Sequence, residues 1–209
     1  MTNPVIEFNE KNHTYIVNGI VTPSVTQLIH LMFPEKYKSI SPAVLKRAAA
    51  RGTKIHETIE YWNIHHELPD GYERRSFTAL ALNRWRGLEE KFKIHITDQE
   101  IPVCYMDGDM PLFAGKFDML GQVNDIDSLL DIKATSKYDR VYLEIQLSMY
   151  RMAIRQTLGR EVDKGYCVWL PKDHLGGLEE VKFRDEDSLL WEIRKLVNLT
   201  EEYHEHFDY

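Results

Sequence analysis

Apolar and polar positions change their period twice along this 209-residue chain. Alternation with period two over residues 5–21, around the turns NEKN and NG, predicts a small β-hairpin or meander. Apolar residues then recur at helical spacing, which predicts three helices. These are a short helix capped by Ser24 and ended by Pro34, a longer one from Ser41-Pro42 to His66 with a candidate break at Gly52, and a third over about 72–95.

The period returns to two in the middle of the chain. Residues 100–106, 111–123 and 128–134 have the pattern of three strands, and the short turns DGDM and NDID between them predict antiparallel neighbours. A helix over about 140–157 follows, then strands near 164–170 and 178–183. A final helix, 185–207, carries an apolar stripe made of Leu189, Ile193, Leu196, Val197, Tyr203 and Phe207.

This order of elements predicts an α/β (α+β) fold with a mixed central β-sheet flanked by helices. The length suits one domain over residues 1–209. Within it we expect an N-terminal β-hairpin/helix extension (1–40) and a C-terminal acidic amphipathic helix (185–207).

Composition adds a few exclusions. The chain is 43% hydrophobic and 28% charged, which is typical of globular proteins, and it has no run of eighteen apolar residues and no apolar signal core at its N-terminus. We therefore expect a cytoplasmic protein with no membrane partner. Cys104 and Cys167 cannot form a four-thiolate metal site and are expected to be buried. The tryptophans Trp62, Trp85, Trp169 and Trp191 lie in apolar periodic segments and are expected in the core.

Charge is unevenly distributed around the net value of −7. Residues 36–54 contain six basic residues and no acid, whereas residues 179–209 contain ten acids and four bases. Because charges more than ~10 Å apart are largely screened, a locally basic segment is compatible with phosphate binding in an acidic protein. Arg51 and Lys54 are candidates to contact phosphates, and an ordinary solvated helix face is the alternative.

The segment SLLDIKATSKY, residues 128–138, places two opposite charges in an apolar strand. Side chains of a strand alternate between its faces, so Asp131 and Lys133 point to the same side. Asp118 lies on the preceding strand, and the turn at 124–127 brings it beside Asp131. Two adjacent carboxylates favour a cation between them, and oxygen ligands suit Mg²⁺ or Mn²⁺. Such an ion activates water and neutralises a phosphodiester, while Lys133 stabilises the anionic transition state or orients the water. An exposed salt bridge on a surface strand is the alternative interpretation.

Three further stretches contain polar residues at suggestive spacing. His56 and Glu60 lie one helical turn apart in RGTKIHETIE, Gln146 and Tyr150 lie one turn apart in QLSMY, and Glu100 stands in EIPV. Taken alone, His56 fits a structural histidine equally well, Glu60 fits a solvent-facing residue or a partner of His56, and the Gln146–Tyr150 pair fits a helix surface.

The ordered pieces SVTQLI, RGTKIH, the Glu of EIPV, GKFD, DIK and QLSMY resemble the motifs of the PD-(D/E)XK nuclease superfamily. The likeness is to its RecB-like branch, with the phage and mitochondrial genome maintenance exonucleases and the CRISPR adaptation nucleases. It covers roughly residues 23–170 and implies a restriction-endonuclease-like sheet.

The resemblance implies a role for each matching residue. It implies that His56, Asp118 and Asp131 are metal ligands and that Lys133 is the catalytic lysine. It also implies that the Ile132 backbone carbonyl completes the metal shell and that Glu100 reaches the metal directly or through water. Finally, it implies that Gln146 and Tyr150 support the active site or contact the nucleic acid. With two cysteines, the iron–sulfur cluster of some relatives is excluded.

The sequence therefore predicts a Mg²⁺- or Mn²⁺-dependent DNA exonuclease that acts on single-stranded DNA or on free ends. We expect it in bacterial or phage DNA replication, recombination or repair, in the cytoplasm of a bacterium or a phage-infected host. The alternatives are a non-catalytic nucleic-acid-binding module on the same fold and a structure- or sequence-specific endonuclease. Protein partners are not predicted.

Overall fold

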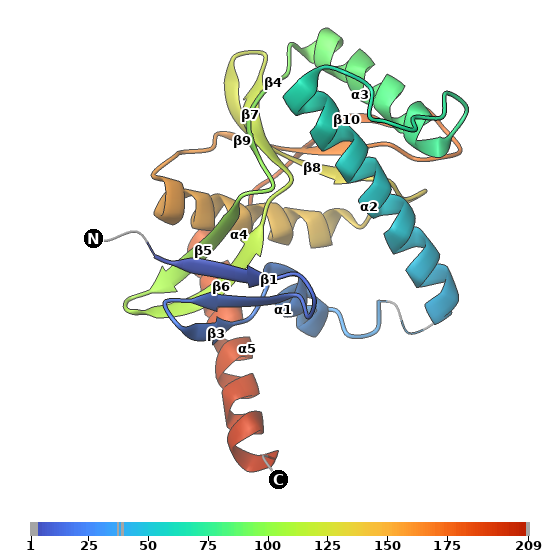
Figure 1. The fold of residues 1–209 in the computed structure, drawn as a ribbon. Helices are drawn as coiled ribbons and strands as arrows, with labels where there is room; N and C mark the ends of the chain where they lie inside the picture. The colour runs from blue at the N-terminus through green and yellow to red at the C-terminus, as the bar shows by residue number, and fades with distance from the viewer. Residues whose placement is uncertain (1–3, 37, 39, 208–209) are drawn as a thin grey trace.

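The computed structural model describes residues 4–36, 38 and 40–207, with side chains described up to residue 198. Runs of strands and runs of helices follow one another along the chain and are not divided into two separate halves (Figure 1). The elements are β1 (Ile6–Asn9), β2 (Thr14–Val17), β3 (Ile20–Thr22), α1 (Val25–Met32), α2 (Pro42–His65), α3 (Phe77–Phe92), β4 (His95–Gln99), β5 (Pro102–Asp107), β6 (Met110–Lys116), β7 (Met119–Val123), β8 (Ile126–Lys133), α4 (Arg140–Leu158), β9 (Lys164–Trp169), β10 (Gly177–Val181) and α5 (Glu186–Phe207).

A five-stranded mixed sheet in the order β10-β9-β8-β7-β4 forms the centre of the molecule. The β8–β9 pair is parallel and the other neighbours are antiparallel. Leu130 and Ile132 of β8 pack into a cluster with residues of α2 and α3, whereas Leu129 faces the α4 side. Helices thus cover both faces of the sheet, which confirms the predicted α/β class and the mixed sheet flanked by helices (Figure 1).

Two small sheets lie beside the central one. Strands β1, β2 and β3 form an antiparallel meander, and β5 pairs with β6 as a hairpin. Helix α1 follows the meander and is started by a capping box, in which the Ser24 hydroxyl accepts from Gln27 N and the Gln27 side chain accepts from Ser24 N. Val25, Leu28 and Ile29 of α1 are buried in the same core cluster as α4.

The strand predicted over 111–123 is in fact two strands. Phe117 and Asp118 interrupt it, so β6 belongs to the β5–β6 hairpin and β7 to the central sheet. A period-two pattern does not reveal such a change of sheet, because the side chains on both parts are buried. The break places Asp118 at the end of a strand rather than within one.

Other boundaries also differ from the predictions. Helix α3 runs over Phe77–Phe92 rather than about 72–95, and it is followed by Lys93 in the left-handed region. Residues 95–99 form strand β4, which was not predicted. Helix α2 runs through Gly52 without a break. Glu100 does not lie on a strand but in the turn between β4 and β5.

The tryptophans do not share one environment. Trp85 is fully buried and Trp62 and Trp169 are half-buried, but Trp191 is 58% exposed, with the Lys195 ammonium 3.7 Å from its ring centroid. Its place in the core was therefore predicted wrongly. Helix α5 extends away from the sheet, and the side chains of Tyr203 and Phe207 lie outside the described residues (Figure 1).

Among the described residues, the longest helices all contain too many polar and charged side chains to cross a membrane.

Candidate metal and nucleic-acid site

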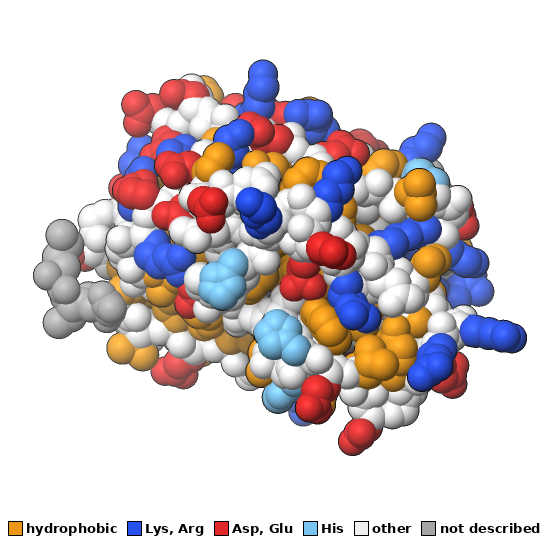
Figure 2. All heavy atoms as spheres, turned by 90° about the horizontal axis from the view of Figure 1, so that it is seen from above, with side chains coloured by type: hydrophobic (Ala, Val, Ile, Leu, Met, Phe, Trp, Pro, Cys, Tyr) orange, Lys and Arg blue, Asp and Glu red, His pale blue; other side chains and the backbone are white. Residues whose placement is uncertain are grey.

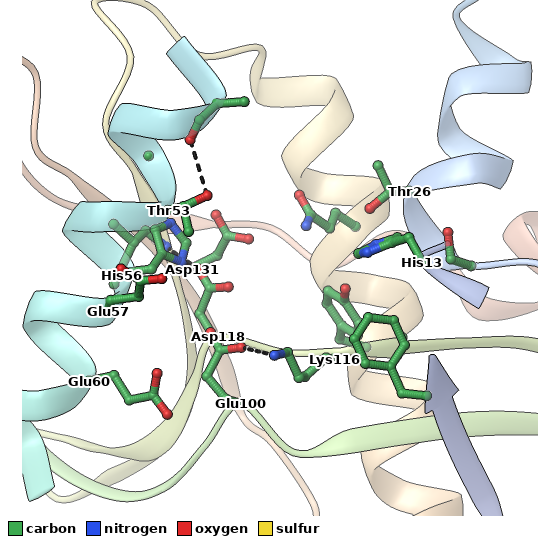
Figure 3. Close-up of a pocket in the computed structure, with 18 of the residues that line it drawn as sticks. His13, Thr26, Thr53, His56, Glu57, Glu60, Glu100, Lys116, Asp118 and Asp131 are labelled. Carbon is green, nitrogen blue, oxygen red and sulfur yellow. Dashed lines mark hydrogen bonds and ion pairs between the residues drawn. The ribbon is translucent and has the colours of Figure 1, made fainter. Parts of the chain in front are cut away.

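A cavity of about 660 Å³ lies where α2, the central sheet, α4 and the N-terminal meander meet. It contains most of the residues that the sequence singled out: His56, Glu60, Glu100, Asp118, Asp131, Ile132, Lys133, Gln146 and Tyr150. Figure 3 shows His56, Glu57 and Glu60 from α2 on one side and His13 and Thr26 on the opposite side. The cavity is therefore formed by segments that are far apart in sequence.

Asp118 and Glu100 are brought together by the interruption between β6 and β7. Glu100 has a positive φ of 54°, and its backbone N–H donates to the carbonyl oxygens of Phe117 and Asp118, each at 3.1 Å. The turn before β5 is thereby attached to the point where the chain changes sheets. One ligand atom each from His56, Glu100 and Asp118 lies within 4.8 Å of the others. The three residues form a candidate metal-binding group.

The Asp118 carboxylate is held from two directions. Its Oδ2 accepts a hydrogen bond from the Ile132 backbone N–H at 2.7 Å and lies 3.6 Å from His56 Nδ1. Its side chain is 16% exposed. Burial raises the pKa of Asp118 to about 6; the charge of Asp131 raises it as well, and His56 lowers it. An ionised Asp118 thus has unfavourable surroundings that a nearby cation would improve.

His56 owes its position to the packing of α2. Ile55 and Ile59 are buried against the sheet, so His56 points toward the cavity at the edge of that contact. Two turns after His56, the Asn63 amide donates to Gln99 Oε1 at 3.0 Å, and the Gln99 amide donates to Glu60 O at 3.1 Å. These bonds tie α2 to the end of β4, directly beside Glu100.

Asp131 and Lys133 lie on one face of β8 as a close ion pair. Lys133 Nζ is 2.6 Å from Asp131 Oδ2 and donates to Gln146 Oε1 of α4 at 3.2 Å. Asp131 is only 2% exposed, and its Oδ2 accepts no hydrogen bond of regular geometry despite the short ion-pair contact. Burial alone would lower the pKa of Lys133, but the charges of Asp131 and Asp118 outweigh it, so the pKa lies above the usual lysine value. Lys133 is therefore a fixed positive charge at neutral pH.

The register of β7 and β8 explains how Asp131 reaches Asp118. Met119 pairs with Leu130, and the next step of this antiparallel register places Asp118 opposite Asp131. The two carboxylates interact electrostatically. Asp131 is nevertheless not part of the compact group of His56, Glu100 and Asp118, and its carboxylate is paired with Lys133.

Tyr150 fills the α4 side of the cavity, one turn after Gln146. It is 6% exposed, and burial holds its pKa well above the usual tyrosine value. Its ring lies against the backbone of Gly115: a Cβ at this position would come within 2.8 Å of Tyr150 Cε1. The glycine of the GKFD motif is therefore required for the close approach of β6 to α4.

Two of the predicted nucleic-acid-binding residues do not line this cavity. Arg51 donates to the Ala134 backbone carbonyl at 3.2 Å and lines a separate small pocket, so its guanidinium holds α2 against the end of β8. Lys54 is exposed and borders another groove with Tyr61 and Tyr72. The exposed charges are mixed: on the face shown in Figure 2, basic and acidic side chains are interspersed.

Sequence reasoning missed several residues of the cavity. Lys116 forms an ion pair with Glu100 at 2.7 Å, and burial of this lysine is outweighed by the Glu100 interaction, which raises its pKa (Figure 3). Phe8, His13 and Tyr15 of the N-terminal meander also line the cavity, and Figure 3 shows His13 across it from His56. Lys116 stands inside the GKFD motif and was visible there, whereas no short-range pattern links the meander to the acidic residues.

The donor atoms around Asp118 fit a hard divalent cation. Carboxylate oxygens with one imidazole nitrogen are ligands that Mg²⁺ and Mn²⁺ accept. Asp131 lies beside this group, with its Oδ2 engaged by Lys133 Nζ at 2.6 Å, and would bring a third carboxylate to the ion. The residues present are therefore consistent with a divalent metal site.

No family model matches this chain, and no curated protein matches its sequence. Among solved structures, the chain is similar to SSO0001, with a TM-score of 0.47 and 17% identity over 84% of this chain and 74% of that one. It is also similar to a protein from Eubacterium rectale named "Putative exonuclease", with a TM-score of 0.41 and 10% identity over 86% of this chain and 73% of that one. Because both TM-scores are below 0.5, the function is inferred from the residues of the cavity.

Proposed function

We propose that this protein is a metal-dependent DNA exonuclease that hydrolyses phosphodiester bonds with Mg²⁺ or Mn²⁺. One observation carries the proposal: the ligand atoms of His56, Glu100 and Asp118 lie within 4.8 Å of one another in a cavity that also contains the Asp131–Lys133 ion pair. A group of candidate metal ligands next to a fixed ammonium group is suited to a substrate that carries a phosphate. The resemblance of the sequence motifs to the nuclease superfamily supports the two finer parts of the proposal, that the substrate is DNA and that hydrolysis begins at strand ends.

In this proposal His56, Asp118 and Asp131 would hold the ion, Glu100 would bind it directly or through water, and the Ile132 carbonyl would be a further ligand. When bound, the ion neutralises the phosphate and lowers the pKa of a coordinated water. Lys133 stabilises the negative charge that develops on the phosphate, because its ammonium stays protonated and is fixed by Asp131 and Gln146. Lys133 acts as an electrostatic group rather than as a base.

Gln146 and Tyr150 position Lys133 and the α4 wall. Arg51 is assigned to fold stability and Lys54 to the outer groove, because neither lines the cavity. The proposal thus assigns the chemistry to residues of β7, β8 and α2 and the support of Lys133 to α4.

The proposal is tested by incubating the protein with three end-labelled substrates of the same sequence: single-stranded DNA, blunt duplex DNA and RNA. Each substrate is incubated with Mg²⁺, Mn²⁺ or EDTA. We expect stepwise shortening of DNA that requires the metal. Asp131→Ala and Lys133→Ala should lower the rate by roughly 10²-fold or more, whereas Lys137→Ala, an exposed lysine outside the cavity, should not change it. Hydrolysis at the parent's rate by either cavity variant would refute the assignment.

Two further measurements separate the alternatives. An exonuclease needs an end, so linear DNA should be degraded and closed circular DNA should persist; cleavage of the circle would indicate an endonuclease. Calorimetric titration with Mn²⁺ should detect a site that is lost in Asp118→Asn. Absence of that site together with DNA binding would favour the non-catalytic module.

A further inference from the structure

The N-terminal meander contributes aromatic rings to the lining of the cavity. It is formed by Phe8 at the end of β1, by His13 in the following turn and by Tyr15 of β2. Figure 3 shows His13 on the far side of the cavity from His56 and Asp118. Nothing in the proposed hydrolysis uses these rings.

The three rings are arranged as a layered surface. Phe8 stacks on Tyr15 with ring centroids 4.5 Å apart and planes inclined by 28°, and His13 meets Phe8 edge-on at 5.1 Å. Tyr15 is 3% exposed and belongs to the small core beneath the meander, whereas Phe8 is half-buried and His13 is exposed. Tyr15 is therefore the support, and Phe8 and His13 provide the accessible ring surface.

Lys116 connects this surface to the acidic group. Its ammonium lies 5.8 Å from the Phe8 ring centroid and forms the ion pair with Glu100 at 2.7 Å. The His13 backbone has a positive φ of 54°, a left-handed conformation that few non-glycine residue types adopt. The aromatic rings, the Lys116 ammonium and the candidate metal-binding residues thus border a single cavity.

We propose that Phe8 and His13 hold an unpaired base of a nucleic acid strand by stacking while its phosphate lies at the His56, Glu100 and Asp118 group. This inference rests on the proposed function and specifies its substrate class: single-stranded DNA or an unpaired end. A base inside a duplex has both faces covered by its neighbours and must leave the stack to contact an aromatic ring. Because every base can stack on an aromatic side chain, the site would distinguish single-stranded from duplex nucleic acid but would not distinguish one sequence from another.

The test measures binding rather than hydrolysis. Fluorescence anisotropy of a labelled single-stranded oligonucleotide of mixed sequence, with Ca²⁺ in place of Mg²⁺ or Mn²⁺ as the hard cation, is compared with a blunt duplex of the same length. The double substitution Phe8→Leu and His13→Asn removes both rings, and Asn tolerates the left-handed conformation at position 13. We expect about tenfold weaker binding of the single strand and less than twofold change for the duplex.

Two variants complete the design. Phe8→Trp keeps a ring and should retain the parent's affinity, which excludes a general loss of folding as the cause. Trp191→Leu removes an exposed ring on α5, away from the cavity, and should change neither affinity. Equal weakening of single strand and duplex, or parent-like binding by the double variant, would overturn the inference.

The outcome is separable from that of the proposed function. A parent protein that binds single strands through Phe8 and His13 but hydrolyses nothing with Mg²⁺ or Mn²⁺ would refute the nuclease and leave the stacking surface in place. A parent that degrades DNA and is indifferent to both rings would refute the stacking surface alone.

Discussion

Replacing Asp118 by Asn should make the metal-free protein more stable at neutral pH. The pKa of Asp118 rises with burial from its ordinary value of 3.8 to about 6, so the folded state holds a proton that the unfolded state has already lost. Stability is therefore lost as the pH rises from about 4 through 6. At about 1.36 kcal/mol per pH unit, the ionised Asp118 destabilises the fold by at most about 3 kcal/mol above pH 7.

The amide keeps the hydrogen bond that matters for the fold. Ile132 N donates to Asp118 Oδ2 at 2.7 Å, and the Asn oxygen can accept in the same way. Urea unfolding of parent and Asp118→Asn in EDTA at pH 4 and pH 8 measures the effect. We expect a gain of about 1–3 kcal/mol at pH 8 that nearly disappears at pH 4. Asp109→Asn in the exposed turn between β5 and β6 should stay within about 0.5 kcal/mol of the parent at both values.

Mn²⁺ provides the complementary arm of this experiment. At a concentration a hundredfold above its dissociation constant, the ion should stabilise the parent by about 2.7 kcal/mol and Asp118→Asn by much less. The electrostatic reasoning would be refuted if Asp118→Asn were less stable than the parent at pH 8 in EDTA. It would also be refuted if the gain in unfolding free energy over the parent were the same at pH 4 and pH 8.

Three other substitutions test the packing around the cavity. Gly115→Ala places a Cβ 2.8 Å from Tyr150 Cε1; it should lower stability by about 1–3 kcal/mol in urea unfolding and slow hydrolysis, and an unchanged protein would contradict the close approach. Lys133→Met leaves Asp131, 2% exposed, without its cation; we expect loss of about 3 kcal/mol at pH 8, measured by urea unfolding. Arg51→Met should cost about 1 kcal/mol through its lost hydrogen bond and leave oligonucleotide affinity unchanged, whereas a large loss of affinity would return Arg51 to the nucleic-acid interface.

The helices and the β7–β8 hairpin were predictable because their signals are local. The Ser24 capping box and the proline that opens α2 mark helix starts within a few residues. The NDID turn sets the register that places Asp118 opposite Asp131. Short-range chemistry of this kind is contained in the sequence itself.

The remaining features depend on contacts between distant segments. Strand β4 was not predicted, because a few residues of alternation after a long helical pattern do not reveal where the period changes. The break at Phe117 and Asp118 follows from β6 pairing with β5 and not with the central sheet. Glu100 reaches Asp118 through its own backbone bonds across that break. Neither consequence is encoded in local spacing.

The aromatic wall illustrates the same limit. Residues 8–15 and 56–131 have no shared pattern, and they meet because the meander packs directly on the β5–β6 hairpin, with Tyr15 and Val17 against Cys104 and Ala114. The apolar stripe of α1 predicted that this helix is buried, but not which surface buries it.

The charges on β8 are the strongest physical reason to regard the cavity as functional. A buried ion pair such as Asp131–Lys133 is seldom more stable than apolar side chains of the same volume, because desolvation offsets the attraction. Leu129 and Leu130 on the same strand show that apolar side chains pack well on both faces. Asp118 adds a third charge whose ionised form burial disfavours. All three side chains face the one cavity that also contains His56 and Glu100, so the stability they cost is concentrated where a cation and a phosphate would restore it.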